Sequence, residues 1–147
     1  MRVYEVVGDK KAYLSLLLLA DEQESMIDRY LAAGTMYVLD DGGVRAQCVV
    51  LDVGGGVLEV KSLSVEPEFQ RRGYGRALLD FVAETYRGRY DYLQVGTGDS
   101  PLTVPFYEAC GFRRHHVVRD FFTENYDHEI WEGGVLLRDM VYLRKSL

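Results

Sequence analysis

The chain has 147 residues, 48% of them apolar, and this length and composition predict a single domain, 1–147, with a full hydrophobic core. Its formal net charge of −6 argues against nucleic-acid binding, which needs a broad basic face. The chain has two cysteines and no apolar stretch long enough to cross a bilayer. We therefore expect a cytoplasmic protein with reduced thiols and no membrane anchor.

Residues 2–7 alternate weakly and predict a first strand. Residues 10–33 carry apolar side chains at three-to-four spacing, with an acidic interruption at 21–24. This pattern indicates two helices with a short joint, closed by Gly34 as a C-cap.

Two strands, 36–39 and 44–51, flank an Asp-Gly-Gly turn and predict a hairpin. A longer strand follows over 57–65. Regular alternation predicts two faces for it, one with Leu58, Val60, Ser62 and Ser64, the other with Val57, Glu59, Lys61, Leu63 and Val65.

The second half of the chain alternates helical and strand patterns, and Pro105 is tolerable only in the first turn of its helix. We expect a helix over 76–87, a strand over 90–95, a helix over 102–110, a strand over 112–120, an irregular segment over 121–134 and a last strand over 135–143. The strand over 90–95 should lie parallel to the strand over 57–65. The sequence thus predicts an α/β fold with a mixed sheet.

The segment Val65–Arg76 reads V-E-P-E-F-Q-R-R-G-Y-G-R, between a strand and an amphipathic helix. Gly73 and Gly75 lack a Cβ, so the backbone can turn tightly and approach a ligand closely. The amides at the start of the helix can bind an anion. Three arginines within six residues reverse the sign of charge locally: Arg71, Arg72 and Arg76. We interpret the segment as a pyrophosphate cradle.

The pattern Gln70-x-x-Gly73-x-Gly75 after a strand resembles the acyl-CoA-binding motif of the GNAT superfamily, the Gcn5-related N-acetyltransferases. The later sequence Y-E-A-C-G-F, Tyr107–Phe112, resembles the Y-E-x-x-G-F element of that family. The resemblance implies a mostly antiparallel central sheet with flanking helices. It also implies a transferase that moves an acetyl group from acetyl-CoA to a primary amine by direct attack in a ternary complex.

The resemblance also implies which residues hold acetyl-CoA. The strand backbone at Leu63, Ser64 and Val65 would pair with the pantetheine arm like an added strand. The family's asparagine contact to this arm is replaced here by Asp99 and Ser100, and Ser100 could instead cap the next helix. The cradle residues would be Gln70, Arg71, Arg72, Gly73, Tyr74, Gly75 and Arg76.

Two residues are the predicted catalytic groups. Tyr107 matches the family's general acid, because a phenol can protonate a departing thiolate; alternatively it is an aromatic packed beside Phe106. Glu59 stands eleven positions before Gln70, the offset of the catalytic glutamate in the histone-acetylating branch, and would be the base. The alternatives for Glu59 are a surface carboxylate paired with Lys61, or a family member that uses a water chain.

The segment 120–140 is longer than the minimal family pattern and resembles a tail in a subgroup of small bacterial GNAT proteins. Its acids around Trp131 predict an acidic, aromatic wall that suits a cationic acceptor, or else a solvated loop or dimer contact. His128, in the same segment, is a further candidate for the acceptor site. His115 and His116, adjacent on a strand, should point to opposite faces, so we expect no metal.

The sequence leaves the acceptor open among a polyamine-like or drug-like amine, an amino acid and a protein amine. A homodimer through the last strands is a family-based expectation. The alternative function is a non-catalytic acyl-CoA-binding sensor or partner-binding module that keeps the cradle without turnover.

Overall fold

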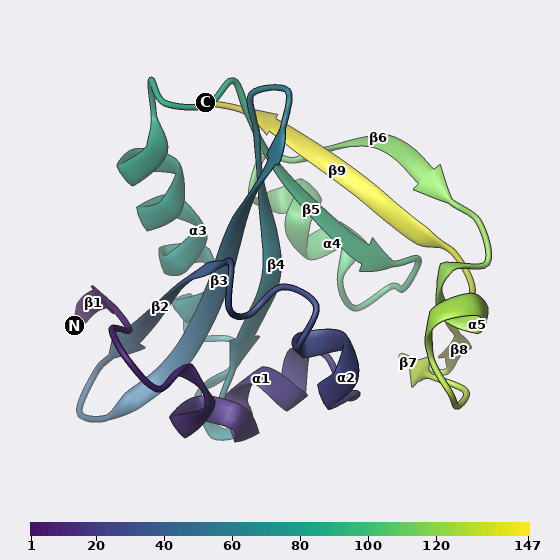
Figure 1. Ribbon diagram of the computed structural model, residues 1–147, viewed down its shortest axis with the longest axis horizontal. Coiled ribbons are helices and arrows are strands. Elements are labelled where there is room, and N and C mark those ends of the chain that lie inside the picture. The colour runs from purple at the N-terminus through teal and green to yellow at the C-terminus, as the bar shows by residue number, and fades with distance from the viewer.

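The computed structural model describes residues 1–147 and contains one seven-stranded sheet with helices on both faces (Figure 1). In spatial order the strands are β1 (Arg2–Glu5), β2 (Thr35–Asp40), β3 (Val44–Gly54), β4 (Val57–Val65), β5 (Tyr92–Gly98), β9 (Met140–Ser146) and β6 (Arg113–Val118). All neighbouring strands are antiparallel except β4 and β5, which are parallel as predicted. The expected mixed, mostly antiparallel fold is confirmed.

Two apolar cores lie on opposite faces of the sheet. On one face, α3 (Tyr74–Tyr86) and α4 (Val104–Ala109) bury Leu78, Val82 and Phe112 against the strands. On the other face, a short 3₁₀ turn (Lys10–Tyr13), α1 (Leu14–Ala20) and α2 (Glu24–Ile27) bury Leu17 and Ile27. No helix in the structure is both long and apolar enough to span a bilayer.

The β4–β5 pair joins two halves of the sheet and then opens. Pairing runs from Val57↔Tyr92 to Val60↔Val95 and stops there, although both strands continue. Figure 1 shows β4 and β5 diverging below their paired ends. The unpaired ends of β4 and β5 flank a slot, and residues of both ends and Tyr107 of α4 (Val104–Ala109) line a cavity there.

A β-bulge in β4 corrects the predicted alternation. Val49 lies opposite Ser62 and Val50 opposite Val60, so Lys61 has no partner on β3. Beyond Lys61 every side chain therefore changes face. Ser62 and Ser64 share the α1 face with Glu59, and the prediction that they point away from Glu59 was wrong.

The C-terminal segment is more ordered than the sequence suggested. The stretch predicted to be irregular contains α5 (Phe121–Asn125) and β7 (Trp131–Glu132), and β7 pairs with β8 (Val135–Leu136) in a small hairpin. The last strand begins at Met140 rather than at 135, because the first residues of that pattern belong to the hairpin. In Figure 1 this segment lies beside the ends of β9 and β6.

The two adjacent histidines also depart from the prediction. A register shift between Arg114 and His116 disturbs the alternation of β6. The Nδ1 atoms of His115 and His116 lie 2.7 Å apart, so the two imidazoles meet rather than face away from each other. The structure contains no group of three or more His, Cys, Asp or Glu side chains arranged to hold a metal ion.

Candidate active site

The cradle lies where the β4 strand passes into α3. Gly73 caps the helix with φ +84°, a left-handed conformation that glycine adopts without strain, and the first helical hydrogen bond runs from Ala77 N to Gly73 O. The helix therefore begins at Tyr74, two residues earlier than predicted, and the amides of its first turn are free to bind an anion.

The cradle side chains have distinct positions. Arg71 is also left-handed, with φ +64°, which is uncommon outside glycine and marks a constrained turn. Gln70 donates from Nε2 to Val65 O at 3.2 Å and so ties the loop to the end of β4. Gly75 is buried against α4: a Cβ there would lie 3.3 Å from Phe106 Cζ. Its role is thus close packing of two helices.

The remaining cradle residues lie at its edges. The Arg72 guanidinium lies 5.0 Å from the centre of the Phe69 ring, and the Tyr74 hydroxyl donates to Asp41. The Arg76 side chain turns toward α4, where its Nη1 lies 3.4 Å from Ala109 O. Arg71, Arg72 and Arg76 are all exposed.

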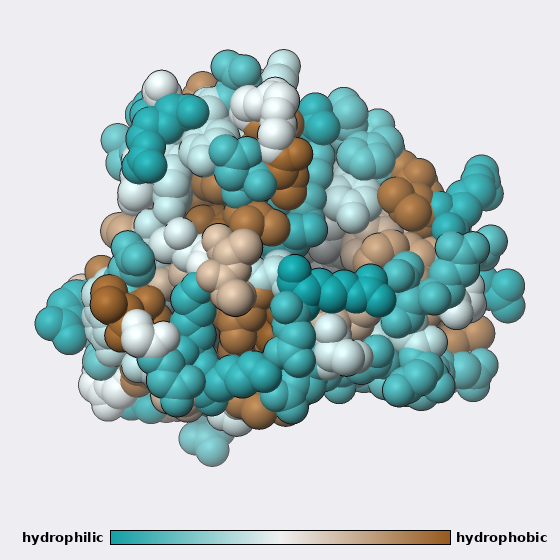
Figure 2. Space-filling model, in the orientation of Figure 1, coloured by the Kyte–Doolittle hydropathy of each residue, from teal (hydrophilic) through white to brown (hydrophobic).

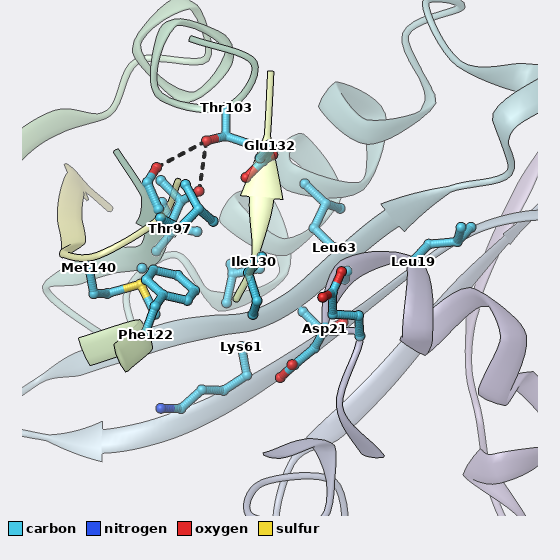
Figure 3. Close-up of a pocket in the computed structure, with 18 of the residues that line it drawn as sticks. Leu19, Asp21, Lys61, Leu63, Thr97, Thr103, Phe122, Ile130, Glu132 and Met140 are labelled. Atoms are coloured by element: carbon cyan, nitrogen blue, oxygen red, sulfur yellow. Dashed lines mark hydrogen bonds between the residues drawn. The ribbon is translucent and has the colours of Figure 1, made fainter. Parts of the chain in front are cut away.

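A cavity of about 370 Å³ continues from the slot between β4 and β5. Figure 3 shows the origin of its labelled walls: Leu19 and Asp21 at the end of α1, Lys61 and Leu63 on β4, and Ile130 and Glu132 around β7. The other lining residues are Ala20, Glu22, Val60, Ser62, Val95, Gly96, Thr97, Gly98, Thr103, Tyr107, Phe122, Tyr126, Trp131, Leu137 and Met140. Figure 2 shows hydrophilic residues over much of the face that it presents, with hydrophobic residues among them.

Tyr107 lines this cavity from α4 and is 8% exposed. Burial raises the pKa of its phenol well above the ordinary value, and the nearby Cys110 and Glu132 add to this effect. The hydroxyl is therefore protonated at neutral pH and can act as a donor. Its ring also packs edge-on against Phe106 and Phe112, so the packing that the sequence suggested is present as well.

Glu59 is buried, at 5% exposed, and does not line the cavity. Its Oε1 accepts from Gln94 Nε2 at 2.6 Å, and its Oε2 lies 2.7 Å from Lys61 Nζ. Gln94 in turn accepts from Arg144 Nε at 2.8 Å. Both carboxylate oxygens are thus engaged, and Lys61, its ion-pair partner, lines the cavity.

The side chains of the three residues expected along the pantetheine arm have different surroundings. Leu63 lines the cavity, and Val65 lies near Gly75, where an added Cβ would be 3.7 Å from Val65 Cγ2. The Ser64 hydroxyl is buried and donates to Leu16 O of α1. Ser100 is buried in the turn before α4, where its Oγ accepts from Leu102 N at 3.0 Å.

Residues 21–29, around α2, are fastened to residues 125–128, at and after the end of α5, by four contacts, which we call the clasp. Tyr126 donates to Asp21 Oδ1 at 2.7 Å, Asp127 N donates to Gln23 Oε1 at 3.1 Å, His128 Nε2 meets Glu22 Oε1 at 2.7 Å, and Arg29 Nη1 donates to Asn125 Oδ1 at 3.0 Å. Both fastened segments line the cavity. The clasp therefore holds two cavity walls that are about a hundred residues apart in sequence.

The family resemblance also implies that the joint between the first two helices lies over the acceptor site, and Asp21 and Glu22 of this joint line the cavity. Burial raises the pKa of Asp21, although the hydrogen bond from Tyr126 opposes this shift. The pKa of Glu132 is also raised, by burial and by Glu22. The acidic wall expected around Trp131 contributes Glu132 to the cavity, together with the rings of Phe122, Tyr126 and Trp131.

Comparison with known proteins decides the family. The family model described as an acetyltransferase (GNAT) domain matches residues 32–114. An uncharacterised N-acetyltransferase of Bacillus subtilis, YvbK, is 35% identical over 135 residues, which cover 90% of this chain and 87% of YvbK. The chain belongs to the GNAT acetyltransferases.

Two solved structures of this family show the same fold over nearly the whole chain. An IAA acetyltransferase from Bacillus cereus has 34% identity and a TM-score of 0.91, with 99% of both chains covered. A GNAT family acetyltransferase from Elizabethkingia anophelis has 30% identity and a TM-score of 0.93, covers 99% of this chain and 97% of its own, and was crystallised with acetyl-CoA bound. The tail after β6 is thus part of the shared fold of these GNAT proteins.

Proposed function

We propose that this GNAT protein is an acetyl-CoA-dependent N-acetyltransferase that acetylates a small cationic primary amine by direct attack in a ternary complex. The observation that carries the proposal is the slot between β4 and β5. One end of the slot lies near the anion-binding start of α3, and the cavity at its side contains Tyr107. A thioester lying along the slot would meet an acceptor in that cavity.

The residues present fit acetyl-CoA. The first-turn amides of α3 would hold the pyrophosphate behind Gly73, with Arg71 and Arg72 as exposed cations at its edge. The edge of β4 beyond Val60 has no strand partner on the β5 side, so the pantetheine arm can add there through backbone hydrogen bonds at Leu63 and Val65. Bound acetyl-CoA supplies the activated acetyl group.

Tyr107 would act as the general acid. As the amine nitrogen attacks the carbonyl carbon, the C–N bond forms, the C–S bond breaks, and the phenol gives its proton to the departing sulfur. Burial raises the pKa of this phenol and makes it a weaker acid, so the transfer depends on the negative charge of the thiolate that develops beside it. Tyr107 then regains a proton from solvent.

Glu59 remains the base that the family resemblance implies. Because Lys61 stands between its carboxylate and the cavity, a proton from the acceptor would reach Glu59 only through Lys61 or through water. The water chain considered from the sequence therefore stays an open alternative.

A cationic acceptor fits the charge of the cavity. Three carboxylates line it, from Asp21, Glu22 and Glu132, and its one basic side chain, Lys61, is already paired with Glu59. The aromatic rings of the lining add faces that bind cations. A volume of about 370 Å³ suits a small molecule.

The test combines binding with turnover. We expect acetyl-CoA to raise the melting temperature, and we expect thiol release from acetyl-CoA with spermidine, tyramine or lysine amide above a no-acceptor control. An alanine-initiated peptide serves as the protein-type acceptor. No thermal shift with acetyl-CoA would overturn the proposal, whereas a shift without turnover on any amine would favour the sensor.

A further inference from the structure

The β7–β8 hairpin places one carboxylate in the cavity without a protein partner. Glu132 is half-buried on β7 and lines the cavity. Its pKa is raised by burial and by the charge of Glu22, without a hydrogen-bond partner. The other carboxylates of the region are engaged: Asp21 by Tyr126, Glu22 by His128, and Glu59 by Gln94 and Lys61. Glu132 is thus the carboxylate whose oxygens remain available to a ligand.

Close packing fixes the hairpin against the elements that carry the rest of the site. Gly133, with φ +57°, lies on the turn before α4, where a Cβ would be 3.0 Å from Leu102 Cγ. Leu137 packs against Gly98 of β5, where an added Cβ would lie 2.6 Å from Leu137 Cδ1. Leu137 N also donates to Ile130 O at 2.9 Å. Because α4 also carries Tyr107, the hairpin sets Glu132 relative to the proposed acid.

The electrostatics of this part of the cavity suit a proton acceptor. Burial and the neighbouring Glu22 raise the pKa of Glu132, and Glu132 in turn contributes to the raised pKa of Tyr107. The charged and titratable groups around Glu132 are Glu22 from the α1–α2 joint and Tyr107 from α4, with Asp21 and Lys61 on the other cavity walls. Glu132 can therefore accept a proton in the same cavity in which the protonated phenol of Tyr107 can donate one.

We propose that Glu132 contacts the acceptor amine and receives the proton that the amine releases during acetyl transfer. The acceptor ammonium first gives one proton to solvent, so that a neutral nitrogen attacks. The N–H bond then breaks toward a Glu132 oxygen as the C–N bond forms, and Tyr107 protonates the sulfur as the C–S bond breaks. Glu132 then passes the proton to solvent and Tyr107 recovers one, so the protein returns to its starting state. This inference rests on the proposed function. It makes Glu132 an alternative to Glu59 as the base.

The variant Glu132→Gln tests it, because glutamine keeps the size of the side chain and removes the basic oxygen. With the amine of the panel that turns over fastest, we expect kcat to fall by about 100-fold or more. We also expect the rise of kcat/KM with pH to lose its carboxylate step, and the acetyl-CoA thermal shift to stay. Glu129→Gln, an exposed acid on the same segment, is the matched control and should retain wild-type kcat.

Glu59→Gln provides the competing result. If wild-type protein turns over and Glu132→Gln keeps its kcat and pH profile, the inference fails while the proposed function stands. Loss of the carboxylate step in Glu59→Gln alone would assign the base to Glu59 and would also overturn it. Absence of turnover and of acetyl-CoA binding in wild-type protein would instead remove the proposed function on which the inference rests.

Discussion

At the residue scale, Tyr107 can be tested separately from acetyl-CoA binding, because its side chain lines the proposed acceptor cavity and the proposed cradle lies elsewhere. Tyr107→Phe keeps the ring that packs on Phe112 and removes only the proton donor. We expect kcat to fall by about 100-fold or more, with an unchanged acetyl-CoA thermal shift.

Tyr90→Phe removes a hydroxyl bonded to Asp52 outside the cavity, so it serves as the control for Tyr107→Phe. Its kcat should match that of wild type. Equal turnover in wild type, Tyr107→Phe and Tyr90→Phe would mean that the thiolate leaves without a proton from Tyr107.

Gly73 allows a second residue-scale test because Gly88 provides a close match. Both glycines have left-handed φ angles, +84° and +80°, both flank α3, and a Cβ added to either would have no neighbour within 4 Å. Alanine at either position should lower the free energy of unfolding by about 1–2 kcal/mol, measured in urea. Only Gly73→Ala should also weaken acetyl-CoA binding, because Gly73 shapes the cradle. If Gly88→Ala weakened acetyl-CoA binding equally, the loss of binding in Gly73→Ala would not be due to the shape of the cradle.

At the element scale, the clasp should respond to pH through His128. Hydrogen bonds to Asp127 and then to Glu22 raise the pKa of this exposed imidazole above its ordinary value. A raised folded-state pKa means that the stabilisation is present below pH about 6.5 and is lost as pH rises through the higher folded-state value. The melting-temperature difference between wild type and His128→Gln should therefore be larger at pH 6 than at pH 9.

His115→Gln is the control for the clasp, because the His115 imidazole meets His116 and not a carboxylate. Its melting-temperature difference from wild type should show no comparable loss between these pH values. A difference for His128→Gln that stays constant with pH would show that the clasp does not depend on a charged imidazole.

Local signals predicted the elements, and long-range contacts decided how they combine. The strand Val57–Val65 was predicted with its observed bounds, because apolar and β-branched residues fill it and a proline follows. The faces of this strand were predicted incorrectly. The bulge at Lys61 depends on the register with β3, and the sequence of a single strand does not reveal it. The same bulge explains why Glu59 and Ser62 share a face, against the prediction.

In the candidate site too, local features could be predicted from the sequence and long-range contacts could not. The glycine turn before α3 was recognisable, because the conformation of Gly73 is a local property, although the helix begins at Tyr74 and not at Arg76 as predicted. The cavity was only partly recognisable, because the contact of Tyr126 with Asp21 joins residues 105 positions apart, and no pattern in either segment specifies it. The hairpin that carries Glu132 was hidden for a similar reason: two-residue strands are too short to show a period.

At the scale of the whole molecule, the sheet consists of two antiparallel halves joined by the short β4–β5 pairing. Beyond Val60 and Val95 no backbone hydrogen bonds link the halves, so the slot is where the sheet is least continuous. Acetyl-CoA in the slot would replace the missing strand partner on the β4 side. Ligand at 100 times its Kd would add about 2.7 kcal/mol to the free energy of unfolding.

We therefore expect acetyl-CoA to slow amide exchange in two ways. Exchange by global unfolding should slow throughout the chain, whereas local opening should be suppressed chiefly at 61–65 on β4 and 71–76 in the cradle. Peptides from β1 and β2, on the far side of the sheet, report the global contribution alone. Hydrogen–deuterium exchange read by mass spectrometry distinguishes the two contributions, because added protection at 61–65 must exceed that at β1 and β2. Uniform protection would mean that the pantetheine arm does not pair with β4, and added protection confined to β6 would place the ligand outside the slot.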